Sequence, residues 1–321
     1  MKFASLVSLN ILLLHNTKNS VKTTTAAMST SSKIKTIDSH LHIWANKTEE
    51  KKYPYASTDQ IPPGSLQDRA SASYLLETMK NSNVDGALIV QPINHKFDHS
   101  YVASAIKEYP TKFKGMLLHD PSLSAGDAVK RLEELVLQGF VGVRFNPYLW
   151  SAGSFMSQDD GSGIAVYKRC SELKIPVGIM CFKGLDLHYD DIIQLLEKSP
   201  ETILVLDHFA FTKLDEKGDE CFQKLLSLSK YPSVHVKISA FFRLSDNDGY
   251  PYEKLRAERF VPLLEAFGSN RLMFGSDFPF VLEQEEGYGR TVDLVQSWCA
   301  TSDDNKSLMS GTAERIFGVW G

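Results

Sequence analysis

Two histidines spaced two residues apart lie near the start of the chain, in the segment Thr36–Trp44. His40 and His42 follow Asp38 at the same spacing. Alternate side chains of a β-strand point to the same face, so the pattern predicts all three on one face. Imidazole and carboxylate groups gathered in this way can bind a metal ion, polarise a carbonyl group or transfer protons. The alternative is a strand end whose histidines only make hydrogen bonds to loops.

Two further apolar runs end in residues of the same kind. Leu272–Phe280 presents Asp277, and Thr202–Phe211 presents Asp207 and His208. Buried parallel strands read as continuous apolar runs, and catalytic residues gather at their carboxyl ends. The three runs therefore predict one shared site at the mouth of a barrel. Within it we expect Asp277 beside the histidines of the first strand, and Asp207 turned outward toward the helices.

A fourth run, Val141–Pro147, carries Arg144 and Asn146 on one face. An arginine in an otherwise apolar strand needs a partner. That partner is either a substrate carboxylate, held by two parallel hydrogen bonds, or an acidic residue on a neighbouring strand. The position at a strand end favours the substrate.

The four runs together resemble the amidohydrolase-related TIM-barrel family. The resemblance lies closest to the branch that contains 2-pyrone-4,6-dicarboxylate lactonase and its plant relatives, and it extends from about Lys35 to Phe317. It rests on motifs that occur in this order: HxH at His40 and His42, VGVRFNP at Val141–Pro147, DHxxF at Asp207–Phe211, and GSDFP at Gly275–Pro279.

The resemblance implies catalytic roles for His40, His42, His208 and Asp277. Relatives that bind metal usually have a histidine at the end of the fifth strand. This chain has none there, and only Cys181 or Lys183 stands nearby. The lactonase branch works without an essential metal. We therefore expect either no tightly bound cofactor or a single divalent ion, zinc or manganese, on His40, His42 and Asp277.

Three functions compete for this site. The first is a hydrolase that opens a small carboxylate-bearing lactone or a related cyclic ester or amide. In it, Asp277 activates water, His40, His42 and His208 polarise the carbonyl, and Arg144 holds the carboxylate with help from Asn146 or Lys183. The second is a metal-dependent decarboxylase of a small unsaturated acid. The third is a barrel that binds a small anion without catalysis.

The elements that must position these residues form an α/β pattern. Eight apolar, strand-like runs alternate with helical segments over residues 36–321, which predicts one (β/α)8 TIM barrel.

The composition agrees with one domain: the 321 residues are 43% hydrophobic, which suits one large domain. A net charge of −4 gives no basic surface for nucleic acid. No apolar run is long enough to span a membrane. Oligomeric state has no signal in the sequence.

Other features have both structural and functional interpretations. The long loop 45–65 is either a lid over the mouth or a surface excursion. After the second strand, Asp98 is expected to cap a helix, while His95 and His99 stay open. The four cysteines form no CxxC pair, so a reducing compartment is the default.

Residues 1–35 differ in composition from the rest. They contain five lysines, eleven serines or threonines and no acidic residue. This composition favours an organellar transit peptide and a plastid (chloroplast) location. Two alternatives remain: a signal-peptide core at Phe3–Leu14, and a start of translation at Met28 that would leave a cytoplasmic enzyme.

Overall fold

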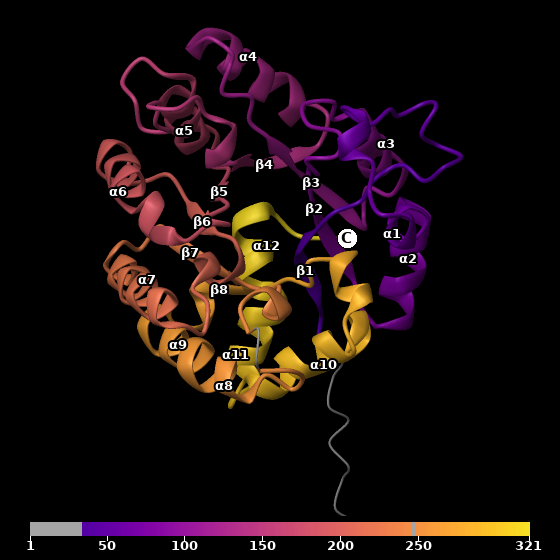
Figure 1. Ribbon diagram of the computed structural model, residues 1–321, viewed down its shortest axis with the longest axis vertical. Coiled ribbons are helices and arrows are strands. Elements are labelled where there is room, and N and C mark those ends of the chain that lie inside the picture. The colour runs from indigo at the N-terminus through magenta and orange to yellow at the C-terminus, as the bar shows by residue number, and fades with distance from the viewer. Residues whose placement is uncertain (1–33, 246–247) are drawn as a thin grey trace, which may run out of the picture. The chain divides into compact units, whose positions relative to one another are not determined.

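Eight parallel strands form a ring in chain order (Figure 1). The structure is a computed structural model and describes residues 34–245 and 248–321. The strands are β1 Ile37–Leu41, β2 Gly86–Val90, β3 Phe113–Leu118, β4 Phe140–Phe145, β5 Val177–Ile179, β6 Leu204–Leu206, β7 Val234–Ile238 and β8 Leu272–Phe274. The ring is joined where Leu41 forms a parallel bridge with Phe278, and the His42 N–H donates to the Phe278 carbonyl at 2.7 Å. The predicted TIM barrel is confirmed.

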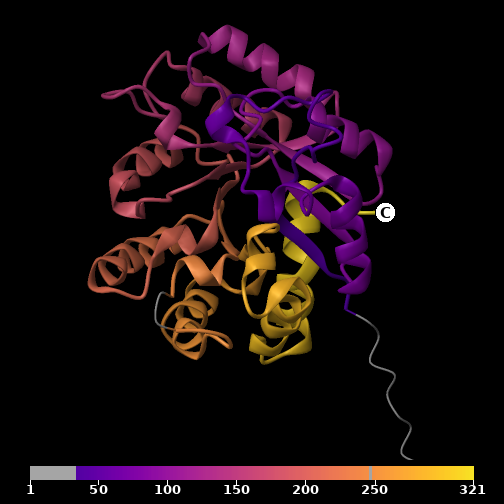
Figure 2. The same ribbon diagram turned by 45° about the vertical axis from the view of Figure 1, so that its right-hand side comes forward.

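Helices surround this ring, except for α12, which covers one end of it, as the two ribbon views show (Figures 1 and 2). They are α1 Gly64–Gln67, α2 Ala72–Asn81, α3 Ser100–Glu108, α4 Ala125–Val136, α5 Ser162–Leu173, α6 Tyr189–Lys198, α7 Glu216–Ser227, α8 Glu253–Leu255, α9 Val261–Phe267, α10 Gly287–Trp298, α11 Ser302–Lys306 and α12 Thr312–Phe317. No helix in the described ranges is long and apolar enough to cross a membrane.

Local sequence signals explain where several helices begin. The hydroxyl of Ser71 accepts the N–H of Tyr74 at the start of α2, and Ser124 accepts that of Asp127 at the start of α4. Such caps satisfy backbone donors that the first helical turn leaves free. The apolar faces of the helices then pack on the outer faces of the strands in one continuous core.

A second core fills the amino-terminal end of the barrel. There α12 and the residues after it cover the strand starts, and Figure 1 shows this helix in the middle of the ring. The Trp320 indole N–H donates to the Ala87 carbonyl at 3.3 Å, and the ring lies against Gly86. A Cβ at Gly86 would approach Trp320 to 2.3 Å, so only glycine leaves room for this ring. The carboxyl ends of the strands remain for the site.

The observed elements differ from the expected ones mainly at their ends. The segment Thr36–Trp44 forms a strand only over Ile37–Leu41, and the apolar run Leu272–Phe280 forms one only over Leu272–Phe274. His42 and Asp277 therefore lie just past the ladder. Between α8 and α9 the chain forms a π-helical turn, at residues 256–260.

The loop 45–65 packs beside the barrel mouth rather than across it. It leads into α1. The Ala56 N–H donates to the Asn94 carbonyl at 2.8 Å, and the Asn94 amide donates to the Gln60 carbonyl at 2.7 Å. None of residues 45–65 lines the cavity described below, so the lid interpretation has no support here.

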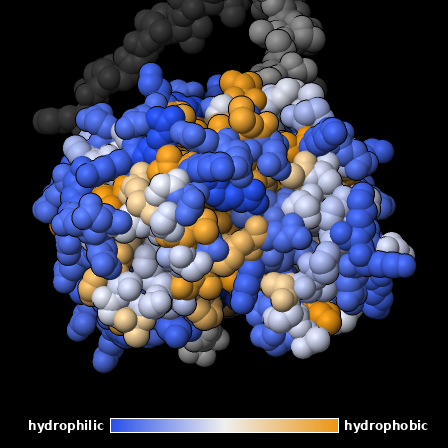
Figure 3. Space-filling view, turned by 90° about the horizontal axis from the view of Figure 1, so that it is seen from above, coloured by the Kyte–Doolittle hydropathy of each residue, from blue (hydrophilic) through white to orange (hydrophobic). Residues whose placement is uncertain are grey.

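The face of the molecule shown in Figure 3 is largely hydrophilic. Hydrophilic side chains cover most of its outline, with apolar residues between them.

The predicted leader lies outside the described residues except for its end. There Lys35 forms an ion pair with Glu314 at 2.6 Å and donates to the Trp320 carbonyl, so the contacts of the barrel begin before residue 36.

Candidate active site

The end of β1 supplies two histidines but not the carboxylate expected with them. The pairing of β1 with β2 shifts register between Asp38 and Leu41, which breaks the simple alternation of side chains. Asp38 accepts hydrogen bonds from the backbone and hydroxyl of Ser276 and from the Tyr288 hydroxyl. The prediction that Asp38 shares a face with His40 and His42 is therefore wrong: Asp38 supports the loop after β8.

His42 has its proton position set by the backbone. Its Nδ1 lies 2.8 Å from the Val90 carbonyl oxygen, which can only accept, so Nδ1 carries the hydrogen and Nε2 keeps a lone pair. Nε2 lies 3.7 Å from Asp277 Oδ1. Burial lowers the pKa of His42 well below its usual value, and the Arg144 charge lowers it further. His42 thus faces the site as a neutral acceptor.

His40 lies deeper, with no exposed surface. Its Nδ1 is 3.1 Å from Asp207 Oδ1 and 3.1 Å from the Lys237 ammonium nitrogen. Its Nε2 is buried and has no hydrogen-bond partner among the described residues. Burial lowers the pKa of His40 to about 3, although Asp207 opposes that shift. This ring is therefore neutral and presents an unused nitrogen to the site.

Asp277 stands on the turn after β8, where its backbone has a φ of 59°. Its N–H donates to the His40 carbonyl at 2.9 Å, and Gly275 allows this approach because a Cβ there would lie 2.8 Å from His40 Cβ. The Arg243 Nε donates to Asp277 Oδ2 at 2.8 Å. Burial raises the pKa of Asp277 to about 6, and the Arg243 charge limits the rise. A carboxyl group with this pKa can accept a proton at neutral pH and later return it.

His208 reaches the same carboxylate from β6. It begins a turn in which four consecutive residues, His208 to Phe211, have positive φ values between 51° and 56°. Its Nδ1 lies 2.7 Å from the Ser239 hydroxyl and its Nε2 lies 3.9 Å from Asp277 Oδ1. When Ser239 donates to Nδ1, Nε2 carries the hydrogen and His208 becomes a donor to the site.

Asp207 points into the barrel, so the prediction that it faces the helices is wrong. It is fully buried and contacts three side chains from three strands: Arg144 Nε at 3.1 Å, Lys237 Nζ at 3.2 Å and His40 Nδ1 at 3.1 Å. The two cations and the histidine hold the pKa of Asp207 well below its usual value, against the effect of burial. The apolar run does not predict the direction of the Asp207 side chain. The strand ends before Asp207, and the alternation of side chains ends with the strand.

A cavity of about 270 Å³ opens above these groups. Trp44, Phe182, Phe211 and Phe280 give it aromatic walls. Its polar lining consists of His42, Asn94, Arg144, Asn146, His208, Arg243 and Asp277. Apolar walls with a few convergent polar groups are typical of small-molecule sites.

The sequence-predicted binding residues divide between this cavity and its surroundings. Arg144 and Asn146 line it, although Arg144 also has the acidic structural partner Asp207. Lys183 does not line it: its ammonium lies 5.2 Å from the ring centre of Tyr148. Cys181 is fully buried in the outer core, and burial raises the pKa of its thiol. Neither residue replaces the histidine missing after the fifth strand.

The histidines left open by the sequence have structural roles. His95 stacks on Tyr55 and its Nε2 accepts the N–H of Ala45. His99 accepts the N–H of Leu118 at 3.0 Å. Asp98 accepts the N–H of Ser100 beside the start of α3, close to its expected capping role.

Two residues of the site were missed by sequence reasoning. Arg243 sits on the turn after β7 and forms the ion pair with Asp277. Lys237 is a charged residue within the apolar strand β7, and it is fully buried. The charge inside an apolar run was the available signal, because buried lysines are rarely unpaired.

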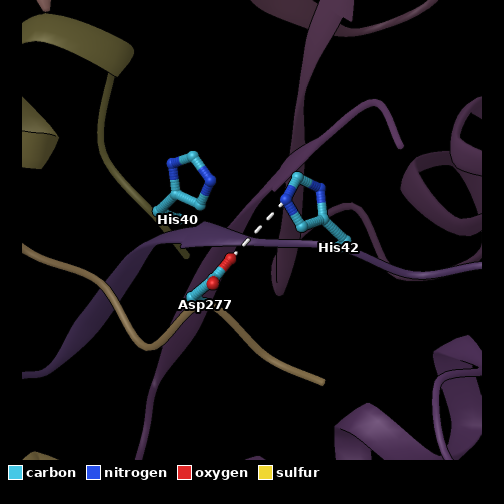
Figure 4. Close-up of side chains that lie close together, drawn as sticks. All are labelled: His40, His42 and Asp277. Carbon is cyan, nitrogen blue, oxygen red and sulfur yellow. Dashed lines mark ion pairs between the residues drawn. The ribbon is translucent and has the colours of Figure 1, made fainter. Parts of the chain in front are cut away.

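Ligand atoms of His40, His42 and Asp277 lie within 4.8 Å of one another, and these are the three residues that the sequence predicts for a metal (Figure 4). Two neutral imidazoles and one carboxylate are a usual donor set for zinc and similar ions. The buried Nε2 of His40, which lacks a partner, fits the same purpose. These residues are therefore suited to hold one divalent cation.

Comparisons with known proteins show the family of the chain and agree with the barrel fold. A family model described as amidohydrolase matches residues 37–319. The chain is 23% identical to an L-fucono-1,5-lactonase of Burkholderia ambifaria, over 88% of this chain and 92% of that protein. Among solved structures, a probable 2-pyrone-4,6-dicarboxylic acid hydrolase of Acinetobacter baumannii, crystallised with citric acid, has a TM-score of 0.70 at 20% identity, covering 88% and 99% of the two chains. A Burkholderia multivorans amidohydrolase with bound zinc has a TM-score of 0.68 at 20% identity, covering 89% and 99%.

Proposed function

The chain belongs to the amidohydrolase family and is a hydrolase, and from this premise we propose that it opens a small carboxylate-bearing lactone or a related cyclic ester or amide. One observation carries the proposal. Asp277, a carboxyl group whose pKa is raised to about 6, lies at the cavity between two neutral histidines and one arginine. The names of the L-fucono-1,5-lactonase relative and the 2-pyrone-4,6-dicarboxylic acid hydrolase support a lactone as substrate.

Asp277 acts first, as the general base. Its Oδ1 takes a proton from water, whose oxygen forms a bond to the carbonyl carbon of the ring. The bond between that carbon and the ring oxygen then breaks. The departing oxygen receives the proton back from Asp277, which leaves a hydroxy acid as product. A carboxyl group with a pKa of about 6 is suited to both transfers.

The carbonyl oxygen needs a hydrogen-bond donor, and the two outer histidines differ in this respect. His42 Nε2 holds a lone pair, so neutral His42 cannot donate there. His208 can donate through Nε2 when Ser239 donates to its Nδ1. A divalent cation bound by His40, His42 and Asp277 would supply Lewis-acid polarisation of the carbonyl. In this proposal His208 is thus the carbonyl-polarising residue, and His42 is a ligand or acceptor.

A panel of small lactones and acids tests the proposal. We expect lactone hydrolysis, measured as acid release at constant pH, and faster turnover of lactones that carry a carboxylate. Each assay is repeated after dialysis against a chelator and after return of zinc or manganese, which shows whether the reaction needs a metal. Carbon dioxide release from an unsaturated acid would instead identify a decarboxylase. Tight binding of anions without turnover would identify a non-catalytic barrel.

Arg144 is proposed to hold the substrate carboxylate with the part of its guanidinium not used by Asp207. Arg144→Ala is expected to weaken substrate binding by about 2–5 kcal/mol, since a buried charge partner is lost. Arg144→Lys should recover little, because lysine lacks the planar fork. The measurement is KM, together with the dissociation constant of a non-hydrolysed substrate analogue.

Lys183→Ala is the matched control, because Lys183 is a nearby cation outside the cavity. Its effect on KM should be small, whereas a large effect would restore Lys183 as a substrate-binding residue. If Arg144→Ala lowers thermal stability and leaves KM unchanged, Arg144 serves only as the partner of Asp207.

We also propose that the residues before the barrel form a leader that directs the protein to the plastid. Their lack of acidic residues and richness in serine and threonine support this. Deletion of residues 1–33 keeps Lys35 and its ion pair with Glu314, and should leave melting temperature and kcat/KM unchanged. A fluorescent fusion to residues 1–35 should enter plastids. A large fall in melting temperature, or a fusion that stays in the cytoplasm, would contradict the respective half of the proposal.

A further inference from the structure

A buried carboxylate and a buried ammonium group lie at equal distance from one nitrogen of His40. Its Nδ1 is 3.1 Å from Asp207 Oδ1 and 3.1 Å from Lys237 Nζ. None of the three side chains has exposed surface. The carboxylate can only accept a hydrogen bond and the ammonium can only donate one. Asp207 therefore requires a hydrogen on Nδ1, whereas Lys237 requires a lone pair there.

Each demand selects a different form of the neutral ring. If Nδ1 carries the hydrogen, it donates to Asp207 and Nε2 has the lone pair that a metal ligand needs. If Nε2 carries the hydrogen, Lys237 donates to Nδ1 and Nε2 can only donate to the site. No hydrogen bond to Nε2 from the described residues favours either form.

The other contacts of the cluster leave this choice open. Asp207 also accepts from Arg144 Nε through its second oxygen, so it keeps an ion pair whichever form His40 takes. Lys237 lies 3.2 Å from Asp207 Oδ1 and keeps that partner in both forms. His42 differs, because its Nδ1 faces a backbone carbonyl and has one possible form.

We propose that Asp207 and Lys237 are positioning residues that act through His40 and set the affinity of the site for a divalent cation. Asp207 favours the tautomer with the lone pair on Nε2, and so favours the cation. Lys237 favours the tautomer with hydrogen on Nε2, and so opposes the cation. The inference concerns the metal-binding capacity of His40, His42 and Asp277 and does not depend on which substrate is hydrolysed.

Nitrogen-15 NMR of metal-free protein labelled at histidine reads the tautomer directly, because protonated and lone-pair nitrogens of imidazole have well separated shifts. Loss of signals in His40→Gln assigns the ring. Asp207→Asn is expected to move His40 toward the form with hydrogen on Nε2. Lys237→Met is expected to move it toward the form with hydrogen on Nδ1.

Zinc titration of the apoprotein gives the second measurement. Changes in the partners of a metal-binding histidine commonly alter metal affinity by about 10–100-fold. Lys237→Met should raise zinc affinity by about that factor, and Asp207→Asn should lower it by a similar one. His235→Gln is the matched control: His235 is buried on the same strand as Lys237 but faces Arg315, so the variant should bind zinc as the unmodified protein does.

The opposite signs distinguish the proposal from simple damage, because misfolding lowers metal affinity in every variant. If Asp207→Asn fails to fold, the gain in Lys237→Met still decides the matter. Unchanged His40 shifts in both variants would overturn the proposal, since any change in zinc affinity would then reflect charge alone. Absence of lactone hydrolysis would refute the proposed function and leave these measurements unaffected.

Discussion

Asp277→Asn is expected to lower turnover by about 10²–10⁴-fold, the usual contribution of a general base. Asparagine keeps the size of the side chain but cannot take a proton from water at neutral pH. It also tolerates the positive φ of this position, so the turn after β8 should persist. Stability should change little, because the variant removes a buried charge together with its ion pair to the partly exposed Arg243. Single-turnover kinetics and melting temperature measure the two effects.

Asp120→Asn is a suitable control for this variant. Asp120 also follows a barrel strand, β3, but lies outside the active-site cavity and accepts hydrogen bonds from Ser122. It should keep normal turnover. If Asp277→Asn instead retains near-normal turnover on the true substrate, another group activates water, and His208 would be the next residue to test.

The same assignment fixes the sign of the pH dependence. Asp277 must be ionised to act as a base, and burial raises its pKa to about 6. Activity of the unmodified protein should therefore rise with pH through about 6 and fall as pH drops below it. Asp277→Asn should remove this step from the residual activity. A profile that stays flat between pH 5 and 7 is incompatible with Asp277 as base.

Trp320→Ala is expected to lower the free energy of unfolding by about 3–5 kcal/mol, as for other large-to-small changes in a core. The indole is 2% exposed, packs against Gly86 and closes the end of the barrel opposite the site. Denaturant unfolding measures the loss of unfolding free energy, provided that the dependence of this free energy on denaturant concentration has the same slope in both proteins. The exposed neighbour Val319 supplies the control: Val319→Ala should change stability by no more than about 0.5 kcal/mol. Equal effects of the two variants would show that the ring contributes little packing.

The sequence was sufficient to predict the barrel and to bring several candidate residues to one cavity. Apolar runs that end in polar residues placed His42, His208 and Asp277 correctly, because the strands of a parallel barrel all deliver their ends to one mouth. The structure also brings His40 close to Gly275, a contact that was not expected from the sequence.

Orientation within the strand ends was harder to predict. Asp38 does not lie on the expected face of β1, because a register shift interrupts the alternation of its side chains. Asp207 faces the barrel interior because its contacts with three buried partners offset the free-energy cost of burying its charge. Those partners come from distant parts of the chain. Pairings such as Arg243 with Asp277 depend on turns after the strands, whose geometry no periodicity describes.

The position of Trp320 also has a consequence for biosynthesis. A chain leaves the ribosome from its amino terminus, so β1 to β8 emerge before the α12 segment that covers their starts. Until α12 follows them, the inner surface around Ile37, Leu88 and Met273 lacks that cover. The core at the amino-terminal end of the barrel is therefore completed late in synthesis, after all eight strands have been made.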